Sequence, residues 1–268
     1  MTGSVEGTSG VDVRRQVRLD DGRHVWCTSP GEAQVLWREM SSQGFYRRAA
    51  GRLRPDDLVL DVGANIGLAA LVFADVQPAA ELIAVEPAPE TFACLRDNLD
   101  RHVPRGTAVQ AAVAAASGTL PFVYYPAAPG NSSLYADQEA DDTLTRTFLR
   151  NTGLDDESIE LMVDGLHDGT PMEVSVTTVS DLLRERGTRP VGLLKIDVER
   201  AELDVLRGIE AADWRRIRNI VAEVHDENDG LDVFCRTLRE HGFVAEVRQD
   251  ANLRNTGLYE VDATRPAD

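Results

Sequence analysis

The amino-acid sequence predicts an α/β fold built on a mostly parallel sheet with helices on both faces. Short apolar runs alternate with segments of helical spacing from residue 58 to residue 241, as in proteins made of βαβ units. A turn with Gly63 and Gly67 follows the first of these runs, where a strand of a parallel sheet gives way to a helix. The length of 268 residues suits one large α/β domain with an appendage.

Residues 1–50 are predicted to form an N-terminal extension that packs on the main domain and covers its ligand site. The first residues, up to Gly10, are rich in Ser, Gly and Thr, a composition typical of disorder. Alternating apolar positions on both sides of Asp20-Asp21-Gly22 indicate a β-hairpin over residues 11–27. Residues 30–50 have the apolar spacing of a helix that breaks near Gly44.

Residues 51–268 are predicted to form the main domain. Because ligands of doubly wound sheets bind at the carboxyl ends of the strands, we expect the site along that edge. The expected strands are residues 58–62, 81–85, 107–112, 119–124, 174–176, 191–197, 217–224, 244–248 and 257–261. The expected helices are residues 66–76, 89–101, 180–186, 201–208 and 231–241.

An insertion over residues 125–171 interrupts this alternation, with short helices expected at residues 144–151 and 157–166. From residue 137 to residue 168 it carries ten acidic residues against two arginines, a net charge of −8. Such a segment is typical of a solvated acidic lobe, or of a lid over a cationic or amino-bearing substrate. The sequence leaves both interpretations open.

Composition argues against several classes of partner. The formal net charge is −17, and this surplus of acids would repel the phosphates of nucleic acids and of anionic membranes. No secretory signal and no bilayer-spanning apolar run is visible, so we expect a cytoplasmic protein. The three cysteines are widely spaced, as in neither a disulfide framework nor a metal cluster. We therefore expect a small-molecule partner, with the oligomeric state open and a homodimer among the options.

The glycine turn indicates a site for an adenosine-containing cofactor. Glu86, at the end of the second strand, stands where an acidic residue binds ribose hydroxyls. The turn reads Asp61-x-Gly63-x-Asn65-x-Gly67, without the G-x-G-x-x-G pattern of a dinucleotide site. A carboxylate at its start repels a pyrophosphate but accepts hydrogen bonds from an amine, so the pattern favours S-adenosylmethionine over NAD. Asn65 either caps the following helix or contacts the methionine carboxylate.

Five segments, taken together, are more specific than the turn alone. They are DVGANIG (residues 61–67), AVEPAPETFACLRDNL (84–99), TTVSDLL (177–183), LLKIDVERAELDVLRGI (193–209) and VAEVH (221–225). With these segments the chain resembles the FkbM-type methyltransferases, a branch of the class I S-adenosylmethionine-dependent enzymes. The resemblance implies a Rossmann-like fold with a mostly parallel seven-stranded sheet. It also implies O-methylation of a small molecule such as a sugar, a polyketide or another secondary metabolite.

One position departs from the family pattern. Arg200 stands where the resemblance leads us to expect glycine, which affects the local backbone shape and the choice of substrate. The cofactor assignment does not depend on it. The residues expected to bind the cofactor are Asp61, Gly63, Ala64, Asn65, Gly67, Glu86, Pro87, Ala112 and Asp197.

His225 is the sequence's best candidate for a general base. Its ordinary pKa lies near neutrality, so it can take a proton from a hydroxyl during methyl transfer, with Glu223 orienting it. The alternative is a strand-end histidine bonded to a loop carbonyl. Lys195, the single lysine, and Asp197 lie on a strand expected to be buried on both faces. Asp197 is expected beside the sulfonium or the substrate hydroxyl, unless Lys195 forms a purely structural ion pair; the nearby acids are Glu199, Glu202 and Glu223.

The remaining expectations concern the substrate and a metal. Tyr46 from the N-terminal extension and Ser132 and Ser133 from the insertion are expected to face the substrate. Arg200 either binds a carboxylate or phosphate of the substrate or is a solvated residue at a helix start. A divalent metal at the rim is a further alternative that no tight ligand motif supports; its ligands would be Asp197, Glu223, His225 and Asp226.

Three other functions stay open at this point. The acidic insertion would suit N-methylation of an amine or amide. The fold and cofactor site could also belong to a binding module without catalysis. An NAD-dependent oxidoreductase is disfavoured by Asp61 and by the missing third glycine.

Overall fold

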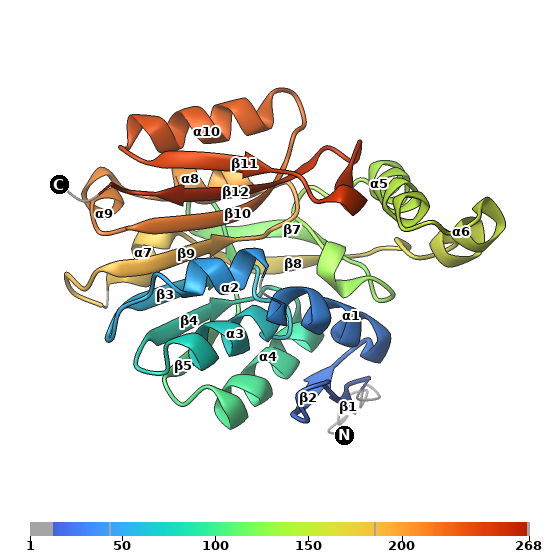
Figure 1. The fold of residues 1–268 in the computed structure, drawn as a ribbon, viewed down its shortest axis with the longest axis horizontal. Helices are drawn as coiled ribbons and strands as arrows, with labels where there is room; N and C mark the ends of the chain where they lie inside the picture. Colours follow the sequence, from blue (N-terminus) through green and yellow to red (C-terminus); the bar gives the residue numbers. More distant parts are fainter. Residues whose placement is uncertain (1–12, 43, 185, 267–268) are drawn as a thin grey trace, which may run out of the picture.

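The computed structural model describes residues 13–42, 44–184 and 186–266 of the chain, and its centre is a seven-stranded sheet (Figure 1). The strand order is β11-β12-β10-β9-β3-β4-β5. Strand β12 runs antiparallel to both neighbours, and the other paired strands run parallel. The strands are β3 (Leu58–Val62), β4 (Glu81–Val85), β5 (Gly106–Val109), β9 (Val191–Ile196), β10 (Asn219–His225), β11 (Val244–Arg248) and β12 (Leu258–Thr264). This is a Rossmann-like α/β architecture, so the predicted mostly parallel seven-stranded sheet with helices on both faces is confirmed.

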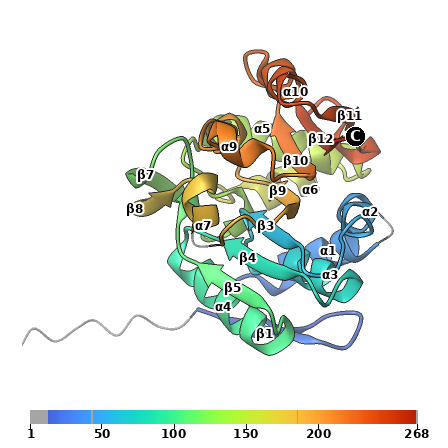
Figure 2. The same cartoon turned by 90° about the vertical axis from the view of Figure 1, so that its left-hand side faces the viewer.

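Two apolar layers hold the helices on the sheet. In β3, Val59 points into one core cluster, whereas Leu58 and Leu60 point into the other, as the alternation of a strand requires. Figure 2 shows α1 and α3 on one side of the sheet and α7 and α9 on the other. The helices of the first layer are α1 (Pro30–Ser41), α2 (Phe45–Ala50), α3 (Leu68–Val76) and α4 (Pro89–His102). Those of the second layer are α7 (Val179–Arg184), α8 (Glu202–Arg207), α9 (Ala211–Trp214) and α10 (Gly230–Glu240).

The N-terminal segment adds a hairpin and two helices to the first layer. Strands β1 (Arg15–Arg18) and β2 (His24–Cys27) pair antiparallel, and α1 and α2 follow with Gly44 as the N-cap of α2. The predicted hairpin and the predicted break near Gly44 are both confirmed. The expectation of disorder at the start of the chain lies outside the described residues, and the division into an extension and a main domain stays a prediction.

The insertion is built on a second, three-stranded sheet. Its strands, in the order β6-β8-β7, are β6 (Ala112–Val113), β8 (Thr170–Thr177) and β7 (Gly118–Tyr124). The strand expected at residues 107–112 was therefore wrong in extent, because β5 ends at Val109 and the chain leaves the main sheet before β6. Gly169 is required at the base of the insertion, since a Cβ there would lie 2.3 Å from Cγ1 of Val123.

Of the two helices of the insertion, the first begins earlier and is longer than expected, and the second ends earlier than expected. After a short 3-10 turn, η1 (Pro129–Asn131), come α5 (Gln138–Asn151) and α6 (Asp156–Val163), which project beyond the sheet in Figure 1. Asp137 caps α5 by accepting a hydrogen bond from the backbone N–H of Ala140. The prediction began this helix at residue 144, where its apolar spacing starts, and therefore missed the polar first turns of α5. A last 3-10 turn, η2 (Ala251–Leu253), lies before β12.

Two further observations concern partners and cysteines. Within the described ranges, every helix is too short or too polar to cross a membrane. All three cysteines are buried thiols that form no disulfide.

Candidate functional site

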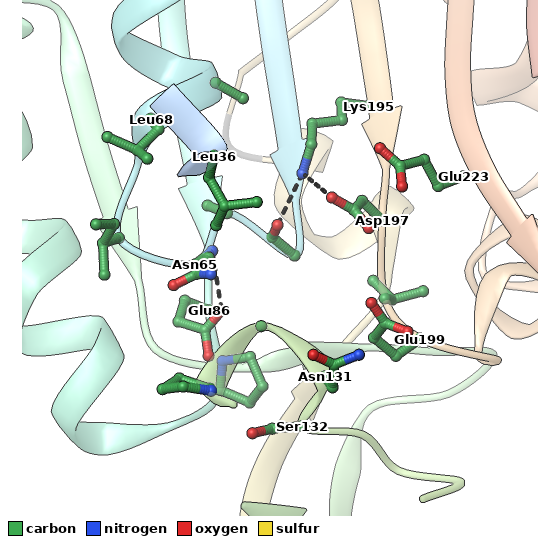
Figure 3. Close-up of a pocket in the computed structure, with 18 of the residues that line it drawn as sticks. Leu36, Asn65, Leu68, Glu86, Asn131, Ser132, Lys195, Asp197, Glu199 and Glu223 are labelled. Atoms are coloured by element: carbon green, nitrogen blue, oxygen red, sulfur yellow. Dashed lines mark hydrogen bonds and ion pairs between the residues drawn. The ribbon is translucent and has the colours of Figure 1, made fainter. Parts of the chain in front are cut away.

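The main cavity opens at the carboxyl ends of the parallel strands and has a volume of about 270 Å³ (Figure 3). The turn after β3 contributes Gly63 to Ile66, and the end of β4 contributes Val85 to Pro87. Helix α1, η1 and α5 close it from the N-terminal segment and the insertion. The site therefore lies where the α/β topology predicts it.

The two glycines of the turn are needed for different reasons. Gly63 has φ +73°, and a Cβ there would lie 1.6 Å from the backbone oxygen of Asp197, so the ends of β3 and β9 meet only across a glycine. Gly67 has φ +91° and is the N-cap of α3; a Cβ there would lie 2.8 Å from Leu95. Gly63 lines the cavity, whereas Gly67 lies outside its wall and shapes the turn.

Glu86 presents a buried carboxyl group to the cavity. Its two oxygens accept hydrogen bonds from the backbone N–H groups of Asn65 (3.1 Å) and Ala88 (2.9 Å). Burial raises the pKa of Glu86 to about 7 despite these two bonds. Each oxygen keeps a lone pair that a ligand hydroxyl can use. Of the other expected cofactor residues, Ala64, Asn65, Pro87 and Ala112 also line the cavity.

Lys195 holds together the floor of the cavity. Its Nζ donates to the backbone oxygen of Gly63 (2.8 Å) and lies 3.1 Å from Asp61 and 3.2 Å from Asp197. Burial lowers the pKa of Lys195, but the two carboxylates outweigh this effect and raise it, so the ammonium stays charged. Lys195 thus forms its ion pairs with Asp61 and Asp197. The structural alternative expected a different partner, one of the acids Glu199, Glu202 and Glu223. Asp61 lies behind Lys195, outside the cavity wall, whereas Asp197 lines it.

Glu223 and Tyr46 meet in the cavity from distant parts of the chain. The Tyr46 hydroxyl, on α2, donates a 2.6 Å hydrogen bond to Oε1 of Glu223, on β10, and also lies 3.4 Å from Asp197. Burial, and next the charge of Asp197, raise the pKa of Glu223 well above its ordinary range. The carboxyl of Glu223 therefore protonates more readily than a solvated one.

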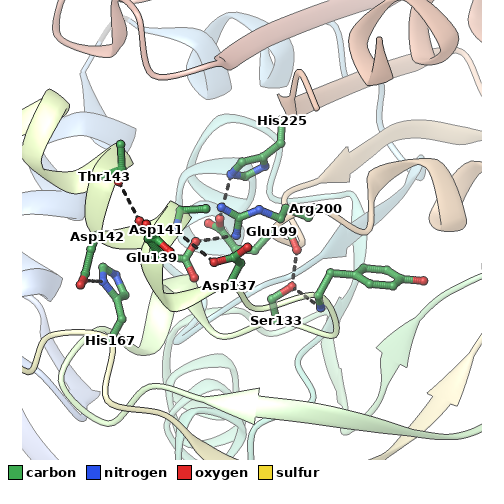
Figure 4. A network of polar contacts seen from close by, with 12 residues as sticks. Ser133, Asp137, Glu139, Asp141, Asp142, Thr143, His167, Glu199, Arg200 and His225 are labelled. Atoms are coloured by element: carbon green, nitrogen blue, oxygen red, sulfur yellow. Dashed lines mark hydrogen bonds and ion pairs between the residues drawn. The ribbon is translucent and has the colours of Figure 1, made fainter. Parts of the chain in front are cut away.

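His225 has surroundings that do not fit the expected general base. Its Nε2 lies 3.2 Å from Glu199 and its Nδ1 lies 2.9 Å from Glu202, and it does not line the main cavity (Figure 4). Burial lowers the pKa of His225, but the two carboxylates outweigh it and raise it to about 10. An imidazolium at neutral pH has no lone pair to accept a proton. Nor does His225 bond a loop carbonyl, because both nitrogens face carboxylates.

Three expected substrate residues have different placements. Ser132 lines the cavity, and its Oγ accepts a hydrogen bond from the backbone of Tyr125. Ser133 does not line it, because its Oγ donates to the backbone oxygen of Glu199. The Arg200 guanidinium pairs with Asp141 and Glu227 and also lies outside the main cavity. Its side chain is only 6% exposed, so Arg200 is not a solvated residue at a helix start, and its contact with the substrate stays a prediction.

The predicted metal alternative gains no support from the geometry. Within the described ranges, no three His, Cys, Asp or Glu side chains are grouped so as to hold a metal ion. Both ring nitrogens of His225 are engaged by carboxylates, Nε2 by Glu199 and Nδ1 by Glu202.

Several lining residues were not anticipated from the sequence. Helix α1 contributes Glu32, whose carboxyl accepts a hydrogen bond from the backbone N–H of Gly130 and whose pKa burial raises to about 7. Amphipathic spacing could have indicated that α1 faces the core, but not that its acids face a ligand. The others are Leu36, Glu39, Met40, Leu134, Phe148 and Leu253.

Comparison with known proteins shows the family of the chain. The model of the methyltransferase FkbM domain matches residues 61–245. The chain is 42% identical over 258 residues to the 31-O-demethyl-FK506 methyltransferase FkbM of Streptomyces tacrolimicus, covering 96% of this chain and 99% of that protein. It is 32% identical over 222 residues to methyltransferase sdnD of Sordaria araneosa, covering 79% and 82%.

A solved structure shares the fold at lower identity. Methyltransferase FkbM from Methylobacillus flagellatus KT aligns with a TM-score of 0.52 and 15% identity, over 84% of this chain and 48% of that one. The family match covers the glycine turn, Glu86, the Lys195 floor and β10, and the relative from Streptomyces extends it to nearly the whole chain. The chain belongs to the FkbM methyltransferase family.

Proposed function

We propose that this methyltransferase uses S-adenosylmethionine to methylate a hydroxyl group of a small molecule. The observation that carries the proposal is the charge of the cavity. Among the residues that the structure describes, six acids line the cavity, and Lys195 is the single lining cation, already paired with Asp61 and Asp197. Such a cavity suits a ligand with a sulfonium and an ammonium and disfavours a pyrophosphate. The acids are Glu32, Glu39, Glu86, Asp197, Glu199 and Glu223.

The residues around the glycine turn fit the cofactor. Glu86 has lone pairs directed at the cavity for ribose hydroxyls, and Ala112 leaves room for a flat ring. Gly63 lets a ligand approach the backbone, and Asn65 offers a side-chain amide. When bound, S-adenosylmethionine supplies the activated methyl group; the protein contributes positioning and exclusion of water.

Glu223 is our candidate for the proton acceptor, in place of His225. A hydroxyl that accepts a methyl group loses its proton, and the deprotonated form of Glu223, whose pKa is raised, is a stronger base than an ordinary carboxylate. Tyr46 holds Glu223 by donating to Oε1, which leaves Oε2 for the substrate. Asp197, with Lys195 behind it, carries negative charge close to the same point. His225 then has a structural role between Glu199 and Glu202.

The relatives support a small-molecule acceptor, and the name of the Streptomyces protein refers to a demethylated oxygen. A second candidate function is N-methylation, which the acids Glu39 and Glu223 would favour by attracting a protonated amine. We propose O-methylation first, because a relative that matches 96% of this chain carries an O-demethylated substrate in its name.

Calorimetry with S-adenosylhomocysteine, with NADH as the control, tests the cofactor. Binding of S-adenosylhomocysteine alone supports the proposal, whereas binding of NADH alone overturns it. Turnover is then measured with 31-O-demethyl-FK506 and with matched panels of hydroxyl and amine acceptors. Methylation confined to the amine panel would replace O-methylation by N-methylation. Binding without any turnover favours a module without catalysis, and loss of turnover in EDTA would restore the metal alternative.

A further inference from the structure

The insertion is joined to the rim of the cavity by a buried ion pair. Arg200, just after β9, contacts Asp141 on α5, and the two side chains are only 6% and 3% exposed (Figure 4). The second oxygen of Asp141 accepts a 2.8 Å hydrogen bond from the Tyr125 hydroxyl, at the base of the insertion. Both oxygens of Asp141 therefore have a polar partner, Arg200 for one and Tyr125 for the other, as a buried carboxylate requires.

The residue before Arg200 joins the same two parts. The backbone oxygen of Glu199 accepts a hydrogen bond from Ser133 of the insertion, and its carboxyl group lines the main cavity and pairs with His225. Arg200 and His225 line a second cavity, of about 390 Å³, on the other side. The Glu199–Arg200 segment therefore separates the two cavities and fastens the insertion to the wall between them.

Helix α5 carries this attachment into the main cavity. Phe148 lies seven residues, or about two turns, after Asp141, so both side chains are on the same face of α5. Phe148 lines the main cavity together with Leu253 of η2. The far end of α5 is tied to η2 as well, because Asn151 donates to the backbone oxygens of Asn252 and Arg254.

We propose that Arg200 is a positioning residue that, through Asp141, holds α5 against the rim and so sets the acceptor-facing wall of the cavity at Phe148. The insertion is then a fixed wall of the acceptor site, in place of the loose lid or solvated lobe that its acidity suggested. The statement about the acceptor rests on the proposed function; the statement about α5 does not.

The structure offers a matched control for the test. Arg200 has a second partner, Glu227, whose side chain is 52% exposed, at 2.6 Å. Asp141→Asn and Glu227→Gln each remove one negative charge from the same guanidinium. We expect amide hydrogen exchange in residues 138–151 to be roughly 10- to 100-fold faster in Asp141→Asn, because a buried pair loses one partner, and nearly unchanged in Glu227→Gln.

Further readouts distinguish positioning from general stability. In Asp141→Asn, exchange in β3 and β9 and the affinity for S-adenosylhomocysteine should stay within about twofold of wild type, since Glu86 and Asn65 are held elsewhere. For an acceptor found in the screen, KM should rise more than kcat falls. Arg200→Lys, which can still pair with Asp141, should recover part of the protection of α5.

Equal exchange of residues 138–151 in the two single variants would overturn the proposal. Faster exchange throughout the sheet in Asp141→Asn would also overturn it, because the pair would then stabilise the whole fold. Failure of wild-type protein to bind S-adenosylhomocysteine would refute the proposed function while leaving the result on α5 intact.

Discussion

Gly63→Ala should separate the ends of β3 and β9. The new methyl carbon would lie 1.6 Å from the backbone oxygen of Asp197, far inside van der Waals contact, so the end of β9 must move away. That movement weakens the bond from Lys195 to the Gly63 oxygen and the bond from the Asp197 N–H to the Val62 oxygen (3.1 Å). The floor of the cavity would lose its shape together with stability.

The magnitude follows from the separate contributions. An alanine at φ +73° costs about 1–2 kcal/mol, and each weakened hydrogen bond about 1 kcal/mol more. The free energy of unfolding should fall by roughly 3–4 kcal/mol, which for a domain of this size lowers the Tm by roughly 6–16 °C. Affinity for S-adenosylhomocysteine should fall as well, because Gly63 and Asp197 line the cavity.

Gly257→Ala is the matched control. Gly257 has φ +78°, and a Cβ there would meet no heavy atom within 4 Å. Both variants remove the same unfolded-state freedom of a glycine and impose a similar backbone strain, so their difference isolates the collision with Asp197. Thermal unfolding and calorimetry compare them. If both variants melt at the same temperature and bind S-adenosylhomocysteine alike, the reasoning about Gly63 is refuted.

Three further outcomes are expected. Glu86→Gln should weaken S-adenosylhomocysteine binding by roughly 1–3 kcal/mol, measured by calorimetry, and unchanged affinity would contradict its ribose role. Glu223→Gln should slow turnover by ~10²–10⁴ at unchanged cofactor affinity, with Tyr46→Phe affected less, whereas wild-type turnover would exclude Glu223 as the proton acceptor. His225 has a folded pKa of about 10, above its ordinary 6.5, so its stabilising charge is present below pH 6.5 and lost as the pH rises through 10. His225→Gln should therefore be less stable than wild type at pH 6, by roughly the 3–5 kcal/mol of a buried ion pair that loses one partner, and this difference in stability should narrow toward pH 10. A difference independent of pH would contradict the assigned charge.

The main sheet could be predicted from the sequence because its signals are local. Runs such as residues 58–62 are apolar except for Asp61, as expected of a strand buried on both faces, and the helices between them have apolar stripes. Gly63 and Glu86 follow successive strands, so the sequence predicted that both lie at the ligand site, and both line the cavity. Each of these inferences needed only a few neighbouring residues.

The chemistry of the rim depends on contacts that the sequence does not reveal. Tyr46 and Glu223 are 177 positions apart, and their hydrogen bond exists only because α2 packs near the end of β10. The pKa of His225 is set by Glu199 and Glu202, and a histidine at a strand end looks the same in sequence whether it faces carboxylates or solvent. The beginning of α5 was missed for a different reason, because its first turns are polar and an Asp cap marks them.

Arg200 combines a feature that is visible in the sequence with contacts that only the structure shows. It adopts φ +70° directly after Glu199 at φ +52°, so two consecutive side chains occupy the left-handed region that glycine takes freely. A side chain at this strained position persists when other contacts outweigh the strain, and Arg200 has a buried partner in Asp141 and an exposed one in Glu227. The departure from the family pattern, which in sequence raised questions about backbone shape and substrate choice, thus coincides with the residue that fastens the insertion to the cavity. We infer that the acidic insertion and Arg200 act as one structural unit, because Asp141 is the acid that the guanidinium requires.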